Sequence, residues 1–125
     1  MLCSYRPEEN HGWHFDKAYF TVNILLRDPE GGGEFEYLTD IQTDGRDNYA
    51  RVEAALEGKS AGVRTANMRE GTLVIFKGHN SPHRVESVTG MVARHLFTLH
   101  FEEKAKVRIS REYRQQMFGL NAPSD

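Results

Sequence analysis

Two histidines and one carboxylate are spaced as ligands of a metal ion would be. His14 and Asp16 are separated by one residue, and residues i and i+2 of an extended segment project to the same side. His83 follows a turn at 78–82 and precedes a strand-like run, so it can supply a third ligand. Two imidazoles and a carboxylate on one face of octahedral Fe(II) leave three adjacent positions open, and zinc accepts the same ligands. The pattern therefore predicts a metal site.

Arg94 adds a permanent positive charge to this set. It lies within the apolar run 91–101, where a charged side chain must find a partner or point to water. A guanidinium inside a barrel can hold a small carboxylate through two parallel hydrogen bonds. A His-x-Asp triplet alone often arises by chance. The presence of His83 and Arg94 further along the chain strengthens the prediction of a binding site.

The elements that must position these side chains are mostly short strands. Apolar and polar residues alternate in 19–26 and again in 34–38, on either side of a turn with three consecutive glycines, which predicts a hairpin. The runs 71–76 and 91–101 are rich in residues that favour strands, among them valine, phenylalanine and threonine. We expect both runs to be strands.

Two segments have the period of a helix. One lies between Asp47 and Gly58, and the other runs from Ser110 to Phe118. Short strands, turn glycines and one or two short helices are typical of a β-sandwich or β-barrel. The sequence therefore predicts a mainly β fold.

Length and composition narrow the classes of function. The 125 residues suffice for a single domain, which we place at 1–125. With 16 basic and 18 acidic side chains, the net charge is −2, and the chain has no basic field for nucleic acid or an anionic membrane. Cys3 is the only cysteine, and the sequence contains no signal peptide or long apolar run. We expect a soluble, cytoplasmic protein that acts on a small molecule.

Together, these residues resemble the catalytic core of the Fe(II)/2-oxoglutarate-dependent dioxygenases. The resemblance runs from about Tyr5 to Phe101 and rests on the ordered motifs Trp13-His14-Phe15-Asp16, Gly32-Gly33-Glu34-Phe35-Glu36-Tyr37, Gly71-Thr72-Leu73-Val74-Ile75-Phe76, His83-Arg84-Val85-Glu86-Ser87-Val88 and Arg94. It implies a double-stranded β-helix, the cupin-like jelly roll, with Fe(II) held by His14, Asp16 and His83. It also implies that 2-oxoglutarate binds the iron, that Arg94 pairs with its distal carboxylate, and that O₂ takes the last position.

Within the superfamily, the likeness is to the branch of free amino acid hydroxylases and halogenases. The halogenases have Gly or Ala in place of the carboxylate ligand, so Asp16 favours hydroxylation of a C–H bond, with decarboxylation of 2-oxoglutarate to succinate. Many relatives carry Arg-x-Ser, whereas here the third position is Leu96. A second contact to the distal carboxylate would then fall to Thr98, Thr21 or Tyr19.

The remaining histidines are expected to face solvent or to serve structure. His11 lies between Asn10 and Gly12, which favours a solvated loop. His100 shares a strand face with Arg94, and we expect a structural role for it.

Two alternative functions stay open at this stage. Relatives usually carry N-terminal helices that support one sheet, and few residues precede His14, so the chain could be a truncated jelly roll that binds a metal or metabolite without turnover. It could also be a cupin-like metalloenzyme that does not use 2-oxoglutarate. If Phe97, Leu99 and Phe101 face outward on a sheet that relatives cover with helices, we expect an exposed apolar patch that needs a partner subunit, such as a second copy, or else a chain that is a fragment.

Overall fold

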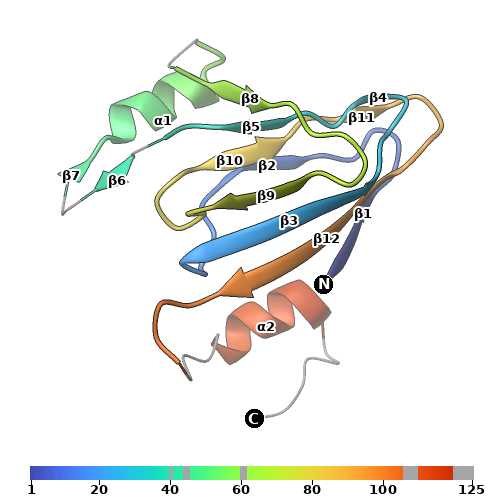
Figure 1. Ribbon diagram of the computed structural model, residues 1–125. Helices are drawn as coiled ribbons and strands as arrows, with labels where there is room; N and C mark the ends of the chain where they lie inside the picture. Colours follow the sequence, from blue (N-terminus) through green and yellow to red (C-terminus); the bar gives the residue numbers. More distant parts are fainter. Residues whose placement is uncertain (40, 44–45, 60–61, 106–109, 120–125) are drawn as a thin grey trace.

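Two antiparallel four-stranded sheets face each other in the computed structural model, which describes residues 1–39, 41–43, 46–59, 62–105 and 110–119 (Figure 1). The first sheet has the order β1-β12-β3-β9, with strands at Leu2–Tyr5, Arg94–Phe101, Phe20–Arg27 and Leu73–Phe76. The second has the order β2-β10-β5-β8, with strands at His11–His14, His83–Val85, Phe35–Tyr37 and Arg64–Ala66. Neighbouring strands come from distant parts of the sequence, as in a jelly roll. The predicted mainly β fold is confirmed.

Two short ladders and two helices accompany these sheets. β4 (Gly31–Gly32) pairs with β11 (Val88–Thr89), and β6 (Gln42–Thr43) pairs with β7 (Arg46–Asp47). The two predicted helices are confirmed as α1 (Tyr49–Leu56) and α2 (Arg111–Phe118), the latter lying below β12 in Figure 1. The Ser110 side chain accepts a hydrogen bond from the Tyr113 backbone N–H and caps α2. Within the described residues, neither helix has the length and apolar character needed to cross a membrane.

The predicted hairpin between 19–26 and 34–38 is wrong. β3 pairs with β12 and β9 in the first sheet, whereas β5 pairs with β10 and β8 in the second. Between them, Gly32 has a φ of +65°, and a Cβ at this position would overlap the carbonyl oxygen of Ser87. The glycine-rich segment therefore pairs closely with β11 as β4, and it carries the chain from one sheet to the other.

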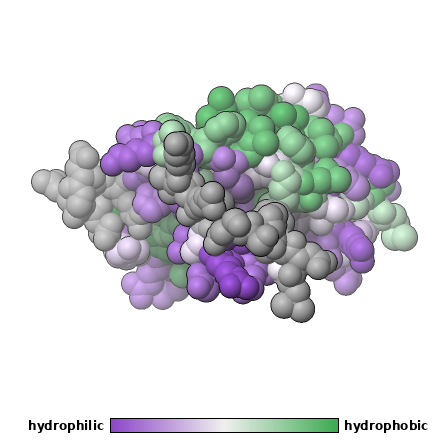
Figure 2. Space-filling view, turned by 90° about the horizontal axis from the view of Figure 1, so that it is seen from below, coloured by the Kyte–Doolittle hydropathy of each residue, from purple (hydrophilic) through white to green (hydrophobic). Residues whose placement is uncertain are grey.

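The first sheet has polar side chains on its inner face and apolar side chains on its outer face. Four polar residues of β3 and β12 are less than 10% exposed and point inward: Thr21, Asn23, Arg94 and Thr98. Phe97, Leu99 and Phe101 alternate with the inward residues of β12 and are 36, 37 and 50% exposed, so their predicted outward orientation is confirmed. Figure 2 shows apolar side chains gathered along one long side of the molecule.

A small apolar cluster anchors the segment that carries two of the candidate ligands. It consists of Leu38, Ile41 and Ala55, with Trp13, Phe15, Val52 and Val63 packed against it. Trp13 and Phe15 flank His14, and side chains alternate along an extended chain. Packing of these two aromatic rings on the cluster therefore directs His14 and Asp16 to the opposite side.

Ile41→Ala is expected to lower the free energy of unfolding by about 2–5 kcal/mol, because it removes part of a fully buried side chain and leaves a cavity. Urea unfolding followed by circular dichroism measures this change. Leu56→Ala is the matched control, because Leu56 is 65% exposed on α1 and its truncation should cost less than about 0.5 kcal/mol. Equal losses in the two variants would contradict the burial of Ile41 in this cluster.

Candidate metal centre

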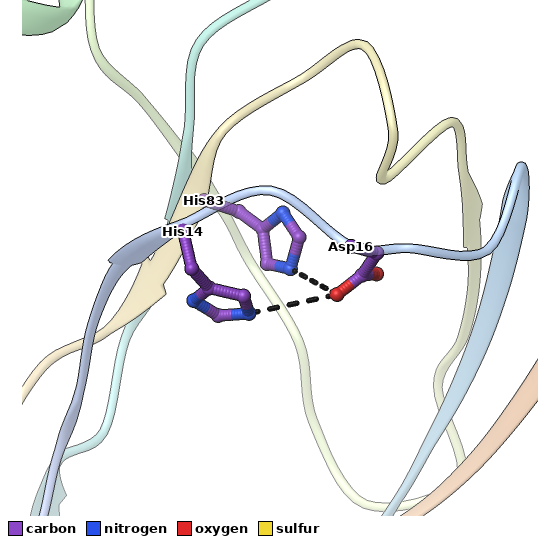
Figure 3. Close-up of side chains that lie close together, drawn as sticks. All are labelled: His14, Asp16 and His83. Carbon is purple, nitrogen blue, oxygen red and sulfur yellow. Dashed lines mark ion pairs between the residues drawn. The ribbon is translucent and has the colours of Figure 1, made fainter. Parts of the chain in front are cut away.

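Three side chains from two segments of the chain converge between the two sheets (Figure 3). His14 ends β2, Asp16 follows it, and His83 begins β10. The antiparallel register of β2 and β10 places His83 directly opposite His14. The Nε2 atoms of His14 and His83 lie 3.6 and 3.4 Å from Asp16 Oδ1, and the three potential ligand atoms all lie within 4.8 Å of one another. The structure thus brings together the three residues that the sequence singled out.

Both imidazoles are oriented by a backbone carbonyl two residues earlier in the chain. His14 Nδ1 lies 2.7 Å from the Gly12 oxygen, and His83 Nδ1 lies 2.9 Å from the Ser81 oxygen. A carbonyl can only accept, so each Nδ1 carries the proton and donates it. Nε2 of each ring therefore faces Asp16, where it donates to the carboxylate when protonated and offers its lone pair to a metal ion when neutral.

Asp16 is held as an anion although it is only 8% exposed. Burial by itself would raise its pKa, but hydrogen bonds with His14, His83 and Thr21 hold the pKa of Asp16 well below its ordinary value. Burial would likewise lower the pKa of His14, and its hydrogen bonds with Asp16 and the Gly12 carbonyl raise it instead. The carboxylate is therefore in the form that binds a cation.

Two further contacts orient the Asp16 carboxylate. Thr21 Oγ1 on β3 donates to Asp16 Oδ2 over 2.5 Å, which leaves Oδ1 toward the imidazoles. The Asp16 backbone N–H donates to the Gly78 carbonyl oxygen over 3.0 Å, and a Cβ on Gly78 would overlap the carboxylate. Sequence reasoning missed both residues, since Thr21 was considered for another role and Gly78 only marked a turn. The Thr21 hydroxyl also lies 3.3 Å from His100 Nδ1, so His100 supports this network.

Arg94 lies in the same interior as a buried cation. It is 1% exposed, and within the described residues it forms no salt bridge and its Nη1 has no hydrogen-bond partner. Its Nη2 lies 4.0 Å from Met68 Sδ, and its guanidinium lies 5.7 Å from the centre of the Tyr5 ring. Burial lowers the pKa of Arg94, but a guanidinium stays charged in proteins. An unpaired buried cation favours an anionic ligand.

A cavity of about 320 Å³ opens onto Arg94. Its wall includes Leu25, Glu34, Phe35, Asn67, Met68 and Arg94. This volume lies at the lower end of the range of ligand pockets, which suits a small molecule.

Asn23 and Thr98 lie between Arg94 and the three converging side chains. The two residues are paired across β3 and β12. On the inner face, the next pair toward the metal cluster is Thr21 with His100, and the next pair toward Arg94 is Leu25 with Leu96. Asn23 is 5% exposed, and its Oδ1 has no hydrogen-bond partner in the described part of the chain. Sequence reasoning missed Asn23, although the alternation of 19–26 placed it on one face with Thr21. Tyr19 instead packs edge-on against Phe20, with their ring centres 4.9 Å apart.

Aromatic side chains surround the more exposed side of the cluster. His11 lies in β2 rather than in the predicted loop, and its ring stacks on that of His14 with centres 3.8 Å apart. The hydroxyl of Tyr5 lies 3.4 Å from His11 Nδ1. Burial, and then the negative charge of Asp16, raise the pKa of Tyr113 on α2.

The donor set fits a divalent metal of the first transition series. Two neutral imidazole nitrogens and one carboxylate oxygen form the two-histidine, one-carboxylate arrangement that suits Fe(II) and leaves positions open for other ligands. The hydrogen bonds behind each ligand are the kind that hold metal ligands in place.

The fold defines the class of protein. An oxidoreductase of the 2OG-Fe(II) oxygenase family from Burkholderia pseudomallei aligns with a TM-score of 0.53 and 19% identity, over 78% of this chain and 38% of that one. A Pseudomonas putida prolyl-4-hydroxylase aligns with a TM-score of 0.54 and 17% identity, over 82% of this chain and 51% of that one. The chain thus has the jelly roll of the 2OG-Fe(II) oxygenases and spans 38 and 51% of the length of these two proteins.

The family is shown by the sequence itself. The model of the Halogenase D family matches residues 2–119, so the chain belongs to that family. No curated protein matches it significantly. The resemblance to the Fe(II)/2-oxoglutarate-dependent dioxygenases is confirmed.

Gly78→Ala is expected to weaken Fe(II) binding by at least about tenfold, because the added methyl group would displace the Asp16 carboxylate. Anaerobic calorimetric titration with Fe(II) measures the affinity. Gly12→Ala is the matched control: nothing lies within 4 Å of a Cβ at that position, and its carbonyl remains available to His14. Unchanged affinity in Gly78→Ala would contradict the assigned role of this close approach.

Proposed function

We propose that this chain is a non-haem Fe(II)/2-oxoglutarate-dependent dioxygenase that hydroxylates a C–H bond of a small molecule such as a free amino acid. One observation carries the proposal: a two-histidine, one-carboxylate cluster and a buried arginine without an ionic partner among the described residues share one interior. A metal cluster alone would suit many functions. The arginine adds a site for the far carboxylate of a ligand that chelates the metal.

Each candidate residue has a distinct role in this proposal. His14, Asp16 and His83 would hold Fe(II), and Arg94 would bind the distal carboxylate of 2-oxoglutarate in the cavity. When bound, iron and 2-oxoglutarate supply the oxidising chemistry: O₂ gives one oxygen atom to succinate as CO₂ is lost, and the other becomes the product hydroxyl.

The protein's own contribution is to position ligands and exclude water. Thr21 and the two imidazoles keep Asp16 ionised, and the two backbone carbonyls keep Nε2 of each ring available. The side chains of Asp16 and His83 are 8 and 5% exposed, whereas that of His14 is 27% exposed. The substrate would therefore approach from the His14 side, where Tyr5 and His11 lie.

The retained carboxylate supports hydroxylation rather than halogenation. The name of the family refers to a halogenase, but halogenases of this superfamily have Gly or Ala where this chain has Asp16. A carboxylate at that position occupies the coordination site that chloride would need. Membership of the family supports the superfamily's chemistry, and Asp16 supports its hydroxylating form.

The proposed substrate is small and the proposed setting is the cytoplasm. A cavity of about 320 Å³ suits a dicarboxylate of the size of 2-oxoglutarate. The net charge of −2 supports a small-molecule substrate over nucleic acid. Cys3, the single cysteine, is unpaired, as is usual for cytoplasmic proteins.

A second candidate is a domain that binds metal and 2-oxoglutarate without turnover. The observation that favours it is that the metal cluster and the buried arginine are binding features, which a domain without turnover would share. Binding of 2-oxoglutarate without release of succinate would support this candidate over the enzyme.

Arg94→Met is expected to weaken 2-oxoglutarate binding at least thirtyfold or so, because it removes the partner of a buried carboxylate. The readout is the visible charge-transfer band formed anaerobically with Fe(II) and 2-oxoglutarate. The same variant should raise the melting temperature of the ligand-free protein by a few degrees, since a buried cation without a partner is replaced by an apolar side chain.

Arg27→Met is the control for this experiment, because Arg27 is exposed on the neighbouring strand. It should leave both the band and the melting temperature close to those of the unmodified chain. A band of full strength in Arg94→Met would rule out the proposed 2-oxoglutarate site.

With Fe(II), 2-oxoglutarate, O₂ and chloride, the protein is expected to release succinate and add one oxygen atom to an accepted amino acid. Mass spectrometry of a panel of free amino acids measures the product, and Asp16→Gly should abolish hydroxylation by removing a ligand. A chlorinated product from the unmodified chain would overturn the assignment of Asp16. A charge-transfer band without succinate for any substrate would favour the binding domain.

A further inference from the structure

A row of inward-facing side chains on the first sheet runs from Arg94 to the metal cluster. Along β12 the row consists of Arg94, Leu96, Thr98 and His100, and the β3 residues paired with the last three are Leu25, Asn23 and Thr21. All of these side chains except that of His100 are less than 10% exposed. A ligand that joins the metal cluster to Arg94 would therefore lie along this row, inside the protein.

The pair nearest to Arg94 in this row is apolar. Leu96 and Leu25 face each other there, so their side chains can offer a ligand no hydrogen bond. The next pair toward the metal cluster, Asn23 with Thr98, is polar. Beyond Arg94 itself, this pair is thus the first place in the row where a side chain can donate to a bound ligand.

Of the polar groups in the middle of the row, the amide of Asn23 is the one whose hydrogen bonding is incomplete. Thr21 Oγ1 donates to Asp16 Oδ2, and Thr98 Oγ1 lies 3.9 Å from Cys3 Sγ. Asn23 is 5% exposed, and its Oδ1 has no hydrogen-bond partner within the part of the chain that the structure describes. A buried amide with an unpaired atom lowers stability, unless a ligand completes its hydrogen bonds.

We propose that Asn23 is a positioning residue that donates a hydrogen bond from Nδ2 to the 2-oxo acid end of 2-oxoglutarate. This inference rests on the proposed function, in which the distal carboxylate of the same ligand pairs with Arg94. A side-chain amide carries both a donor and an acceptor, and the two exchange places when the amide turns over. A carboxylate only accepts, so the Nδ2 end would face the ligand.

The order of the row assigns Asn23 to the end of the ligand that lies at the metal. Asn23 is one inward position from Thr21, whose hydroxyl contacts Asp16. Toward Arg94, the apolar leucine pair intervenes. Arg94 would therefore recognise the charge of the distal carboxylate, and Asn23 would orient the other end of the same molecule against the metal cluster.

Asn23→Leu tests this proposal, because leucine has nearly the same size and forms no hydrogen bond. The charge-transfer band formed anaerobically with Fe(II) should show at least about tenfold weaker binding of 2-oxoglutarate, as expected for a lost hydrogen bond to a charged group. The affinity for Fe(II) should be unchanged, since the hydrogen bonds of Asp16 come from other residues. Asn23→Ala should show the same loss. A loss in Asn23→Leu alone would mean that bulk blocks the ligand, and would overturn the proposal.

The double variant Asn23→Leu/Arg94→Met shows which end of the ligand Asn23 contacts. Contacts with separate ends act independently, so the combined loss should be the product of the two single losses, roughly 300-fold. A combined loss well below this product would place both residues on the distal carboxylate and overturn the assigned end. Asn48→Leu is the matched control and should leave binding unchanged, because Asn48 is exposed before α1 and its side chain makes no capping hydrogen bond.

The melting temperature of the ligand-free chain separates a ligand contact from a purely structural role. Asn23→Leu should raise it by about a degree or more, because an apolar side chain replaces a buried amide with an unpaired atom. A lower melting temperature with full affinity for 2-oxoglutarate would assign Asn23 to the fold alone. A band of full strength in Asn23→Leu would overturn this inference and leave the proposed function standing. The absence of a band in the unmodified chain would overturn both.

Discussion

The buried carboxylate of Asp16 is the group on which this end of the fold depends. An anion that is 8% exposed must receive hydrogen bonds, and these come from Thr21 on β3, His14 on β2 and His83 on β10. The Asp16 backbone N–H also reaches the carbonyl of Gly78 in the turn before β10. Residues of both sheets therefore contact the same buried carboxylate. The hydrogen bonds that join the two sheets here also orient the three potential metal ligands. The same contacts therefore serve both the fold and the candidate metal site.

The interior behind this carboxylate is unusually polar for the space between two sheets. Arg94 and Asn23 each have a buried polar atom without a hydrogen-bond partner among the described residues. Such atoms reduce stability, because their hydration is lost and not replaced. A bound dicarboxylate would satisfy the arginine, and its binding would then also stabilise the fold. The ligand-free chain is therefore less stable, but the side chains of the proposed binding site are already in place before a ligand binds.

The first sheet is polar inside and apolar outside, which is the reverse of a sheet in an isolated soluble domain. The same alternation that directs Thr98 inward directs Phe97 and Leu99 outward. A polar interior therefore leaves the apolar residues of β3 and β12 on the surface. The mean hydropathy of −0.63 conceals this surface, because it averages over residues whose positions differ. A polar interior on one face of this sheet thus leaves an apolar surface on the other.

The sequence by itself determined the short-range features: the alternation of 19–26, the two helices, and the projection of His14 and Asp16 to one side. These depend on neighbouring residues, whose geometry the local backbone sets. The choice of strand partners was decided only by the tertiary structure. The glycines at 31–33 are compatible with a hairpin or a crossover, and pairing with β11, far along the chain, selects the crossover. Likewise, the closeness of Gly78 to Asp16 exists only once the two sheets pack, because long-range contacts between distant segments leave no periodic pattern in the sequence.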